Sequence, residues 1–241
     1  MILTPDSNTL QLTTDMVVLV DKPYGVTSFD VVHEIRKVLS KKLQEKIKIG
    51  HAGTLDPLAT GLLILCTGRL TKEIDLYQGL PKEYSGIIAL GAIRPTYDRE
   101  SEVSETFELP MLDLKQLEDV RLTFLGFQEL LPPAHSAVKV KGIRAYKLAR
   151  KGIDMELKPR PMNIERFDIK SERWPMLDFY IACSKGTYIR TIANEFGLRM
   201  NNGGYLHDLR REKIGNYSVN DAWKLPQLID FIQRSTSQEL D

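Results

Sequence analysis

The segment GHAGTLDPLATG, residues 50–61, combines a single carboxylate with a backbone that suits neither a helix nor a regular strand. Three glycines and Pro57 break or redirect the chain, and apolar neighbours flank Asp56. A loop of this kind fixes the direction of an acid and partly removes it from water, which is how catalytic carboxylates are presented. An isolated Asp-Pro pair is more often a plain surface turn, so the interpretation depends on what accompanies Asp56.

A second candidate segment is CSKGTYIR, residues 183–190, and a Lys-Glu-Tyr run precedes it at residues 82–84. We expect a strand to end in the second segment and a helix to begin, with Thr187 as the cap and Tyr188 and Arg190 on the first turn. The backbone N–H groups of such a turn favour anions. Taken alone, the segment is more often a capped helix start with its tyrosine in the core and its arginine in solvent.

Other patterns that carry chemistry are missing from the sequence. None of the four histidines has a second ligand at metal spacing, and there is no glycine-rich phosphate motif of the P-loop or dinucleotide type. There is no GxSxG element, and a Ser/His/Asp triad has no local support. We therefore expect neither a metal nor a cofactor. Cys66 and Cys183 lie far apart without a CxxC pattern, which favours a reducing compartment.

Charge is segregated along the chain, although its net value is only +1. Residues 135–160 carry eight basic side chains against two acidic ones, and residues 36–48 carry six against one. The compensating acids gather in residues 98–108. This segregation of charge gives a near-neutral protein a strong local positive field. Such basic runs are as consistent with a polyanion partner as with a charged face that contacts only solvent.

Composition is that of a soluble globular protein, with 42% hydrophobic and 27% charged residues in a chain of 241. The length suits one large domain, or one domain with an insertion. The longest apolar runs are too short to span a bilayer, and no secretory signal precedes Lys22. We expect a cytoplasmic protein.

Hydrophobic periodicity predicts irregularly interleaved strands and helices, hence an α+β fold with a mixed or antiparallel sheet. Thr27 is expected to cap a helix that buries Phe29, Val32, Ile35 and Leu39 on one face. Strands are predicted over residues 16–20, 47–49, 61–66, 84–90, 138–140, 164–170, 176–183, 206–209 and 216–219. Helices are predicted after residue 27 and over residues 70–77, 113–124, 143–151, 188–200 and 227–234, with residues 95–110 as an acidic connector.

Together these segments resemble the catalytic domain of the TruB family of pseudouridine synthases, which make pseudouridine in the T-loop of tRNA. The resemblance runs from residue 17 to the Leu209-Arg210-Arg211 region, nearly the whole chain. The GHxGxLDPLATG string is highly specific, and the other family motifs occur in the expected order along the chain. They are DKPxGxTS from Asp21, KxY from Lys82, PxxSAxK from Pro133 and the segment 183–190.

The resemblance implies the pseudouridine synthase fold, a mixed and mainly antiparallel sheet flanked by helices with the active cleft across its middle. It implies that Asp56 is the essential carboxylate and that His51 helps to displace the target nucleotide. Tyr84 would stack on the flipped uracil, and Arg190 would pair with Asp56 beside Tyr188 and keep the carboxylate ionised.

The resemblance also implies one catalytic domain over residues 1–241, in which residues 132–158 form an insertion that clamps the RNA loop. On the predicted helix 143–151, three basic residues share one face at i, i+3, i+7 spacing and suit phosphate contacts. The candidate RNA-binding residues are His51, Tyr188, Lys139, Arg144, Lys147, Lys151 and Lys22.

These roles are chemically consistent. Making pseudouridine cuts the N1–C1′ glycosidic bond, turns the uracil and rejoins it through C5. The base must first leave its stack, at a cost of a few kcal/mol, and meet an aromatic face. A carboxylate near C1′ can attack that carbon or stabilise positive charge there, and removal of a sugar proton is the other open role. Nothing is oxidised, so no cofactor or metal is required.

Two features depart from the family pattern. Many members carry Thr-Asp-Thr-x-Asp where this chain has RPTYD over residues 94–98. Members often carry a C-terminal PUA domain, whereas 30 residues follow Arg211, too few for a second domain. We therefore expect no PUA domain and more of the RNA binding in the insertion.

The leading hypothesis is an enzyme that isomerises uridine 55 of tRNA, with tRNA as its partner, no membrane association and no obligate protein partner. A rival is a non-catalytic RNA-binding module or tRNA-folding chaperone on the same scaffold. A binder has no chemical need to keep Asp56, Tyr84 and Arg190 together. A third hypothesis, an enzyme directed to another RNA by a guide RNA and partner proteins, would favour an appended RNA-binding domain.

Overall fold

The computed structural model describes residues 2–5, 11–136, 138–140, 142–149, 151–153 and 155–237. The chain divides into two compact units, which we describe separately. Unit 1 contains Met1–Glu83 and Arg210–Asp241, and unit 2 contains Tyr84–Leu209. Among the described residues no helix is long and apolar enough to cross a membrane.

The core of unit 1 is built on two long strands. Strand β3 (Val17–Lys22) runs antiparallel to β5 (Ala59–Thr67), in a register that pairs Lys22 with Gly61. Strand β4 (Ile49–His51) pairs antiparallel with the opposite edge of β5, and β1 (Ile2–Leu3) and β16 (Trp223–Lys224) run parallel to β3. Both faces of β3 and β5 are buried, which explains their continuous apolar sequence.

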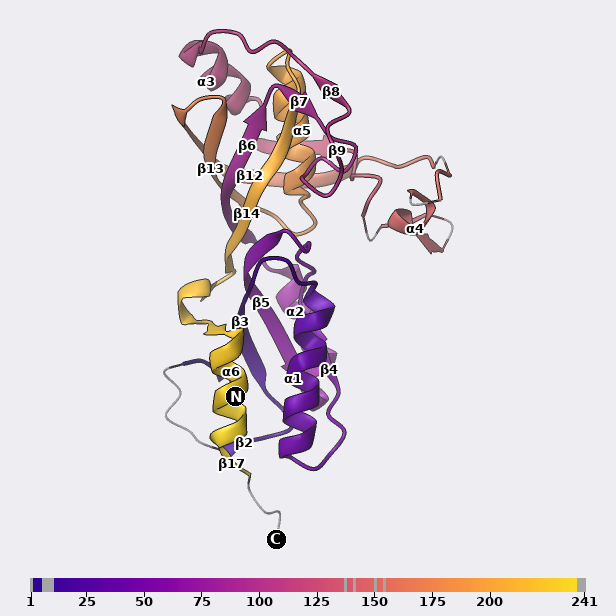
Figure 1. The fold of residues 1–241 in the computed structure, drawn as a ribbon, viewed down its shortest axis with the longest axis vertical. Coiled ribbons are helices and arrows are strands. Elements are labelled where there is room, and N and C mark those ends of the chain that lie inside the picture. Colours follow the sequence, from indigo (N-terminus) through magenta and orange to yellow (C-terminus); the bar gives the residue numbers. More distant parts are fainter. Residues whose placement is uncertain are drawn as a thin grey trace. The chain divides into compact units, whose positions relative to one another are not determined.

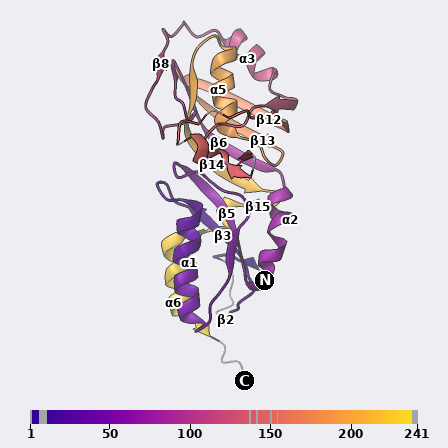
Figure 2. The same ribbon diagram turned by 90° about the vertical axis from the view of Figure 1, so that its right-hand side faces the viewer.

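Helices cover both faces of this part of the sheet. Helices α1 (Ser28–Lys42) and α6 (Leu225–Arg234) lie side by side on one face, and the 3-10 helix η1 (Gly68–Glu73) and α2 (Ile74–Gly79) lie on the other (Figures 1 and 2). The single helix predicted over residues 70–77 is therefore two short ones. The remaining short elements of unit 1 are β2 (Gln11–Leu12), β15 (Tyr217–Ser218), η2 (Val219–Asp221) and β17 (Thr236–Ser237).

Helix α1 begins where the sequence predicts. Thr27 and Asp30 form a reciprocal capping box, with Thr27 Oγ1 accepting from Asp30 N at 3.0 Å and Asp30 Oδ2 accepting from Thr27 N at 2.8 Å. The predicted burial of Phe29 is wrong, because its side chain is 63% exposed. The buried stripe instead contains Val31, which lies one turn before the buried Ile35, whereas Phe29 points away from that stripe.

Unit 2 contains the other half of the mixed sheet. The main sheet has the strand order β1-β3-β5-β14-β6-β13-β12-β9, which confirms the α+β class. Antiparallel pairing joins β12 to β13 and to β9, the latter an edge strand that the sequence does not predict. The strands wholly within unit 2 are β9 (Gly126–Leu130), β12 (Arg160–Arg173) and β13 (Met176–Cys183). Strands β6 (Lys82–Leu90) and β14 (Gly204–Ile214) lie partly in unit 2, and residues 82–83 and 210–214 of them belong to unit 1.

Helices α3 (Leu114–Leu122) and α5 (Ile189–Arg199) pack over this sheet through an aromatic cluster. The rings of Phe124, Phe167 and Phe196 lie 5.8 Å apart, centroid to centroid, in each pair. The prediction that Thr187 caps α5 is wrong. The N-cap residue is Tyr188, and the Thr187 hydroxyl donates instead to Ser184 O. Within the acidic connector, β8 (Glu105–Thr106) pairs antiparallel with β7 (Ala92–Ile93), which lies just before the connector.

The insertion differs from the predicted strand and long helix. Strands β10 (Lys139–Val140) and β11 (Ile143–Arg144) form a hairpin, and helix α4 covers only Ala145–Ala149. Two glycines with positive φ set these limits, Gly142 in the hairpin turn and Gly152 just after the helix. The three predicted phosphate contacts therefore do not share one helical face.

Candidate active site

Asp56 lies in the loop between β4 and β5 and is half-buried. The preceding residue, Leu55, is buried. The carbonyl oxygen of the following residue, Pro57, accepts a hydrogen bond from Gly25 N at 2.9 Å. Asp56 O accepts from Ala59 N at 3.1 Å, which closes a turn. The backbone on both sides of the carboxylate is thus fixed by unit 1 itself, as expected for a positioned acid.

Ser28 anchors the entry to this loop. Its hydroxyl donates to Leu55 O at 3.0 Å and accepts from Leu55 N at 2.9 Å, and the side chain is 1% exposed. Leu55 O belongs to the peptide unit that joins Leu55 to Asp56. Fixing that peptide plane restricts the direction in which the Asp56 side chain leaves the backbone.

Lys22 lies beneath the loop. Its ammonium donates to Val26 O at 2.7 Å, Pro23 O at 2.9 Å and Pro57 O at 3.4 Å. Burial lowers the pKa of Lys22 to about 8, and the Asp56 carboxylate acts in the opposite direction. The prediction that Lys22 contacts RNA is wrong, because its side chain is fully buried and hydrogen-bonded to backbone carbonyls.

Arg211 clamps the two ends of the loop. Its guanidinium, 2% exposed, donates from Nε to Leu62 O at 2.7 Å and from Nη2 to Gly53 O at 3.0 Å. Gly61 has a φ of +104°, and a Cβ there would lie 2.3 Å from Arg211 O. Glycine is therefore required in the LATG end of the motif by close backbone approach as well as by conformation.

His51 is placed at the start of the loop, on the last residue of β4. Burial, and then the charge of Arg211, lower the pKa of its imidazole, so the ring is neutral at neutral pH. Its Nδ1 atom is buried and has no hydrogen-bond partner within the described part of the chain. A neutral, half-buried ring suits contact with a displaced base better than contact with a phosphate.

The remaining predicted catalytic residues lie in unit 2. Tyr84, on β6, is buried, and Arg190, in the first turn of α5, is 5% exposed. Tyr188 is half-buried at the N-cap. Asp56 belongs to unit 1, so the pairing of Arg190 with Asp56 and the stacking role of Tyr84 stay predictions.

Within unit 2, Arg190 is tied to the segment that departs from the family pattern. It lies 3.5 Å from Asp98 Oδ2 and donates to His135 O at 3.0 Å and Thr96 O at 3.3 Å. Asp98 is 4% exposed, and its Oδ1 accepts from Thr96 Oγ1 at 2.6 Å. The altered loop thus supplies a buried carboxylate to the predicted catalytic arginine.

The sequence alone assigns no role to three residues of this arrangement, Ser28, Arg211 and Asp98. Ser28 belongs to the DKPxGxTS motif and Arg211 to the Leu209-Arg210-Arg211 region. Local periodicity does not indicate that either side chain is buried. Asp98 stands in an acidic run that looks solvated. Ser28 and Arg211 could have been identified because each occupies a motif position to which no chemical role is assigned.

The predicted RNA-binding insertion is only partly described. Arg144 in β11 and Lys151 after α4 are exposed, as a phosphate-contacting surface requires. The side chains of Lys139 and Lys147 lie outside the described residues. Among the groups that the structure places, no cluster of His, Cys, Asp or Glu is arranged to hold a metal ion.

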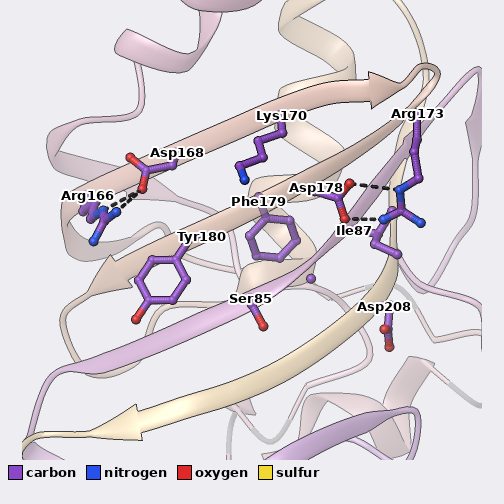
Figure 3. Close-up of a pocket in the computed structure, with 11 residues that line it drawn as sticks. Ser85, Ile87, Arg166, Asp168, Lys170, Arg173, Asp178, Phe179, Tyr180 and Asp208 are labelled. Carbon is purple, nitrogen blue, oxygen red and sulfur yellow. Dashed lines mark hydrogen bonds and ion pairs between the residues drawn. The ribbon is translucent and has the colours of Figure 1, made fainter.

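A separate hollow of about 710 Å³ lies in unit 2 over β12, β13 and β6. Figure 3 shows that four of its charged side chains form two pairs, Arg166 with Asp168 and Arg173 with Asp178. Lys170 lies between the two pairs. None of the predicted catalytic residues lines this hollow, so we do not place the active site there.

Comparison with known proteins places the chain in a family. Residues 36–189 match the TruB family pseudouridylate synthase (N terminal domain). A relative from Flavobacterium johnsoniae named tRNA pseudouridine synthase B is 46% identical, over 86% of this chain and 91% of the relative. A relative of the same name from Chloroherpeton thalassium is 45% identical, over 90% of this chain and 90% of the relative.

Solved structures give the same fold at lower identity. A chain in the crystal structure of a Cbf5-Nop10-Gar1 complex matches with a TM-score of 0.67 and 24% identity, over 95% of this chain and 58% of that one. A chain in an H/ACA RNP bound to a substrate RNA containing 2′-deoxyuridine matches with a TM-score of 0.64 and 22% identity, over 90% of this chain and 53% of that one.

Proposed function

Because this chain belongs to the TruB family of pseudouridylate synthases, we propose that it isomerises uridine 55 in the T-loop of tRNA. The observation that carries the proposal is the loop of Asp56, whose preceding and following peptides are fixed by buried partners. A carboxylate presented in this way matches the reaction, which needs an ionised oxygen at a defined place beside C1′.

In the proposed mechanism the target nucleotide leaves its stack and its base enters the site. Tyr84 receives the uracil on its ring face, and neutral His51 occupies the space that the nucleotide vacates. Asp56 acts at the sugar while the N1–C1′ bond breaks, and the uracil then turns and bonds through C5. Atoms balance without a co-reactant, because the C5 proton is lost as the N1 position gains one.

Arg190 and Lys22 supply the charge that this step needs. We assign Arg190 to the Asp56 carboxylate, in line with the resemblance, and Asp98 to the orientation of Arg190. Lys22 lies under the loop, and the Asp56 carboxylate counteracts the effect of burial on the pKa of Lys22. Exclusion of water protects the broken glycosidic bond from hydrolysis.

The test is Asp56→Asn, assayed by mapping pseudouridine at nucleotide resolution in unmodified tRNA, with purified protein and no guide RNA. We expect loss of pseudouridine at position 55 with tRNA affinity nearly unchanged. Asp119→Asn, at an exposed carboxylate on α3, is the matched control and should retain full activity. Persistent activity in Asp56→Asn would refute the catalytic assignment.

The same assay separates the rival hypotheses. A folding chaperone would leave the wild-type protein unable to form pseudouridine while still assisting tRNA folding. An enzyme that needs a guide RNA would be inactive on tRNA in the purified system.

A further inference from the structure

The C-terminal end of α1 carries exposed lysines that the proposed reaction does not use. Lys37 and Lys41 lie one helical turn apart on α1, and Lys46 and Lys48 follow in the segment that leads to β4. All four side chains are exposed, and we refer to them as the lysine patch. Their backbone belongs to unit 1, the unit that contains Asp56.

Neighbouring basic residues fix the patch to the body of the unit. Arg36 Nη2 donates to Ile49 O at 3.1 Å, and Lys42 Nζ donates to Gln233 O at 3.0 Å on α6. The four patch lysines, in contrast, have no carboxylate partner within the part of the chain that the structure describes. Favourable interaction with the helix dipole accounts for Lys41 in the last turn but not for the lysines beyond the helix.

The composition of the segment indicates which polyanion suits it. Residues 36–48 contain no aromatic side chain, so they offer no platform on which an unpaired base could stack. Lysine contacts phosphate as a compact point charge without reading base edges. The chemistry fits the phosphate backbone of an RNA helix rather than a splayed loop.

The position along α1 agrees with a contact outside the T-loop. Ser28 at the first turn bonds to the Asp56 loop, and a rise of about 1.5 Å per residue puts Lys41 about 20 Å further along the helix axis. A flipped nucleotide at Asp56 cannot reach that far, whereas the stacked helices that continue from the T-loop can.

We propose that the lysine patch is a second RNA contact, which binds phosphates of the tRNA helix beyond the T-loop. The inference rests on the proposed function, because it takes tRNA as the substrate. Its role is affinity and salt dependence, with no part in the chemical step.

The experiment compares whole tRNA with a hairpin that keeps the T-loop on a shortened stem. Lys37→Gln/Lys41→Gln and Lys46→Gln/Lys48→Gln are each combined with Asp56→Asn, so that the RNA stays unmodified while Kd is measured over a series of KCl concentrations. The matched control removes two exposed lysines elsewhere, Lys115→Gln/Lys224→Gln.

For whole tRNA, we expect each patch variant to bind several-fold more weakly and the slope of log Kd against log salt to fall by about 2, roughly one per lost phosphate contact. For the hairpin, both quantities should stay at the control values. Turnover of the hairpin by the patch variants with Asp56 intact should equal that of wild type, which shows that they fold.

Unchanged affinity for whole tRNA would overturn the proposal, and would leave the patch as a solvated face or a surface for a different class of partner. Equal weakening with the hairpin would also overturn it, because the contact would then be local to the loop. Failure of the proposed function is seen separately, as absence of pseudouridine in tRNA treated with the wild-type protein.

Discussion

The hydroxyl of Ser28 bonds both backbone polar groups of Leu55, at 3.0 Å to the carbonyl oxygen and 2.9 Å from the amide nitrogen. A single buried side chain thereby replaces the two hydrogen bonds that a neighbouring strand would supply. The next residue is Asp56. The first turn of α1 is therefore coupled directly to the loop that presents the proposed catalytic carboxylate.

Replacing Ser28 by Ala leaves the buried N–H of Leu55 without an acceptor. We expect a loss of about 1–3 kcal/mol in the free energy of unfolding. The rate of pseudouridine formation at saturating tRNA should fall by up to about 100-fold, because small displacements of a reacting group are costly. Urea denaturation and single-turnover kinetics measure the two effects, and Kd for tRNA should change little.

Ser40→Ala is the matched control, because Ser40 Oγ accepts from Ile47 N at 3.1 Å at the opposite end of α1. It should reduce stability without slowing the reaction. If the two variants slow the reaction equally, Ser28 only supports the fold and does not position Asp56.

Lys22 gives unit 1 a dependence on pH. Its pKa is about 8 in the folded protein and about 10.5 when unfolded, so between these values the unfolded chain binds more protons. The free energy of unfolding of the wild type should therefore rise with pH, relative to Lys22→Met, from about pH 8 to about pH 10.5. Below pH 8 the difference should be constant.

Denaturant titrations at a series of pH values test this expectation. Lys115→Met serves as the control, since Lys115 is an exposed lysine and should show no such divergence from wild type. A flat difference between wild type and Lys22→Met through the alkaline range would mean that the buried ammonium keeps an ordinary pKa.

The buried pair of Arg190 and Asp98 should be far more sensitive to neutralisation than an exposed pair. In Asp98→Asn the guanidinium loses a carboxylate partner in a site where both side chains are 6% exposed, and we expect a loss of about 3 kcal/mol. Asp178→Asn removes the partner of Arg173 on the surface and should cost at most about 1 kcal/mol.

Thermal and urea unfolding of both variants provide the comparison. Activity gives a second readout, because Asp98→Asn should also slow pseudouridine formation through Arg190, whereas Asp178→Asn should not. Equal stability losses in the two variants would show that the buried ion pair contributes no more than a surface one.

The sequence predicted elements whose signals are local. The cap of α1 was found because Thr27 and Asp30 are three residues apart, and the long buried strands were found from their apolar runs. Strand β9 was missed because only Leu130 of its residues is buried and Phe127 is 68% exposed, so no alternation marks it. In the insertion, the sequence predicts one helix over residues 143–151, because β11 and α4 are each too short to show a period.

By itself, the sequence determined the family, the α+β class and the loop that contains Asp56, since specific motifs and local spacing carry that information. Only the tertiary structure decided what holds the loop. Ser28 lies 27 residues from Leu55, and Arg211 lies 158 residues from Gly53, so their hydrogen bonds leave no periodic trace in the chain. Burial also decided that Lys22 supports the loop instead of binding RNA, because a lysine looks the same in sequence whether its ammonium meets water or three carbonyl groups.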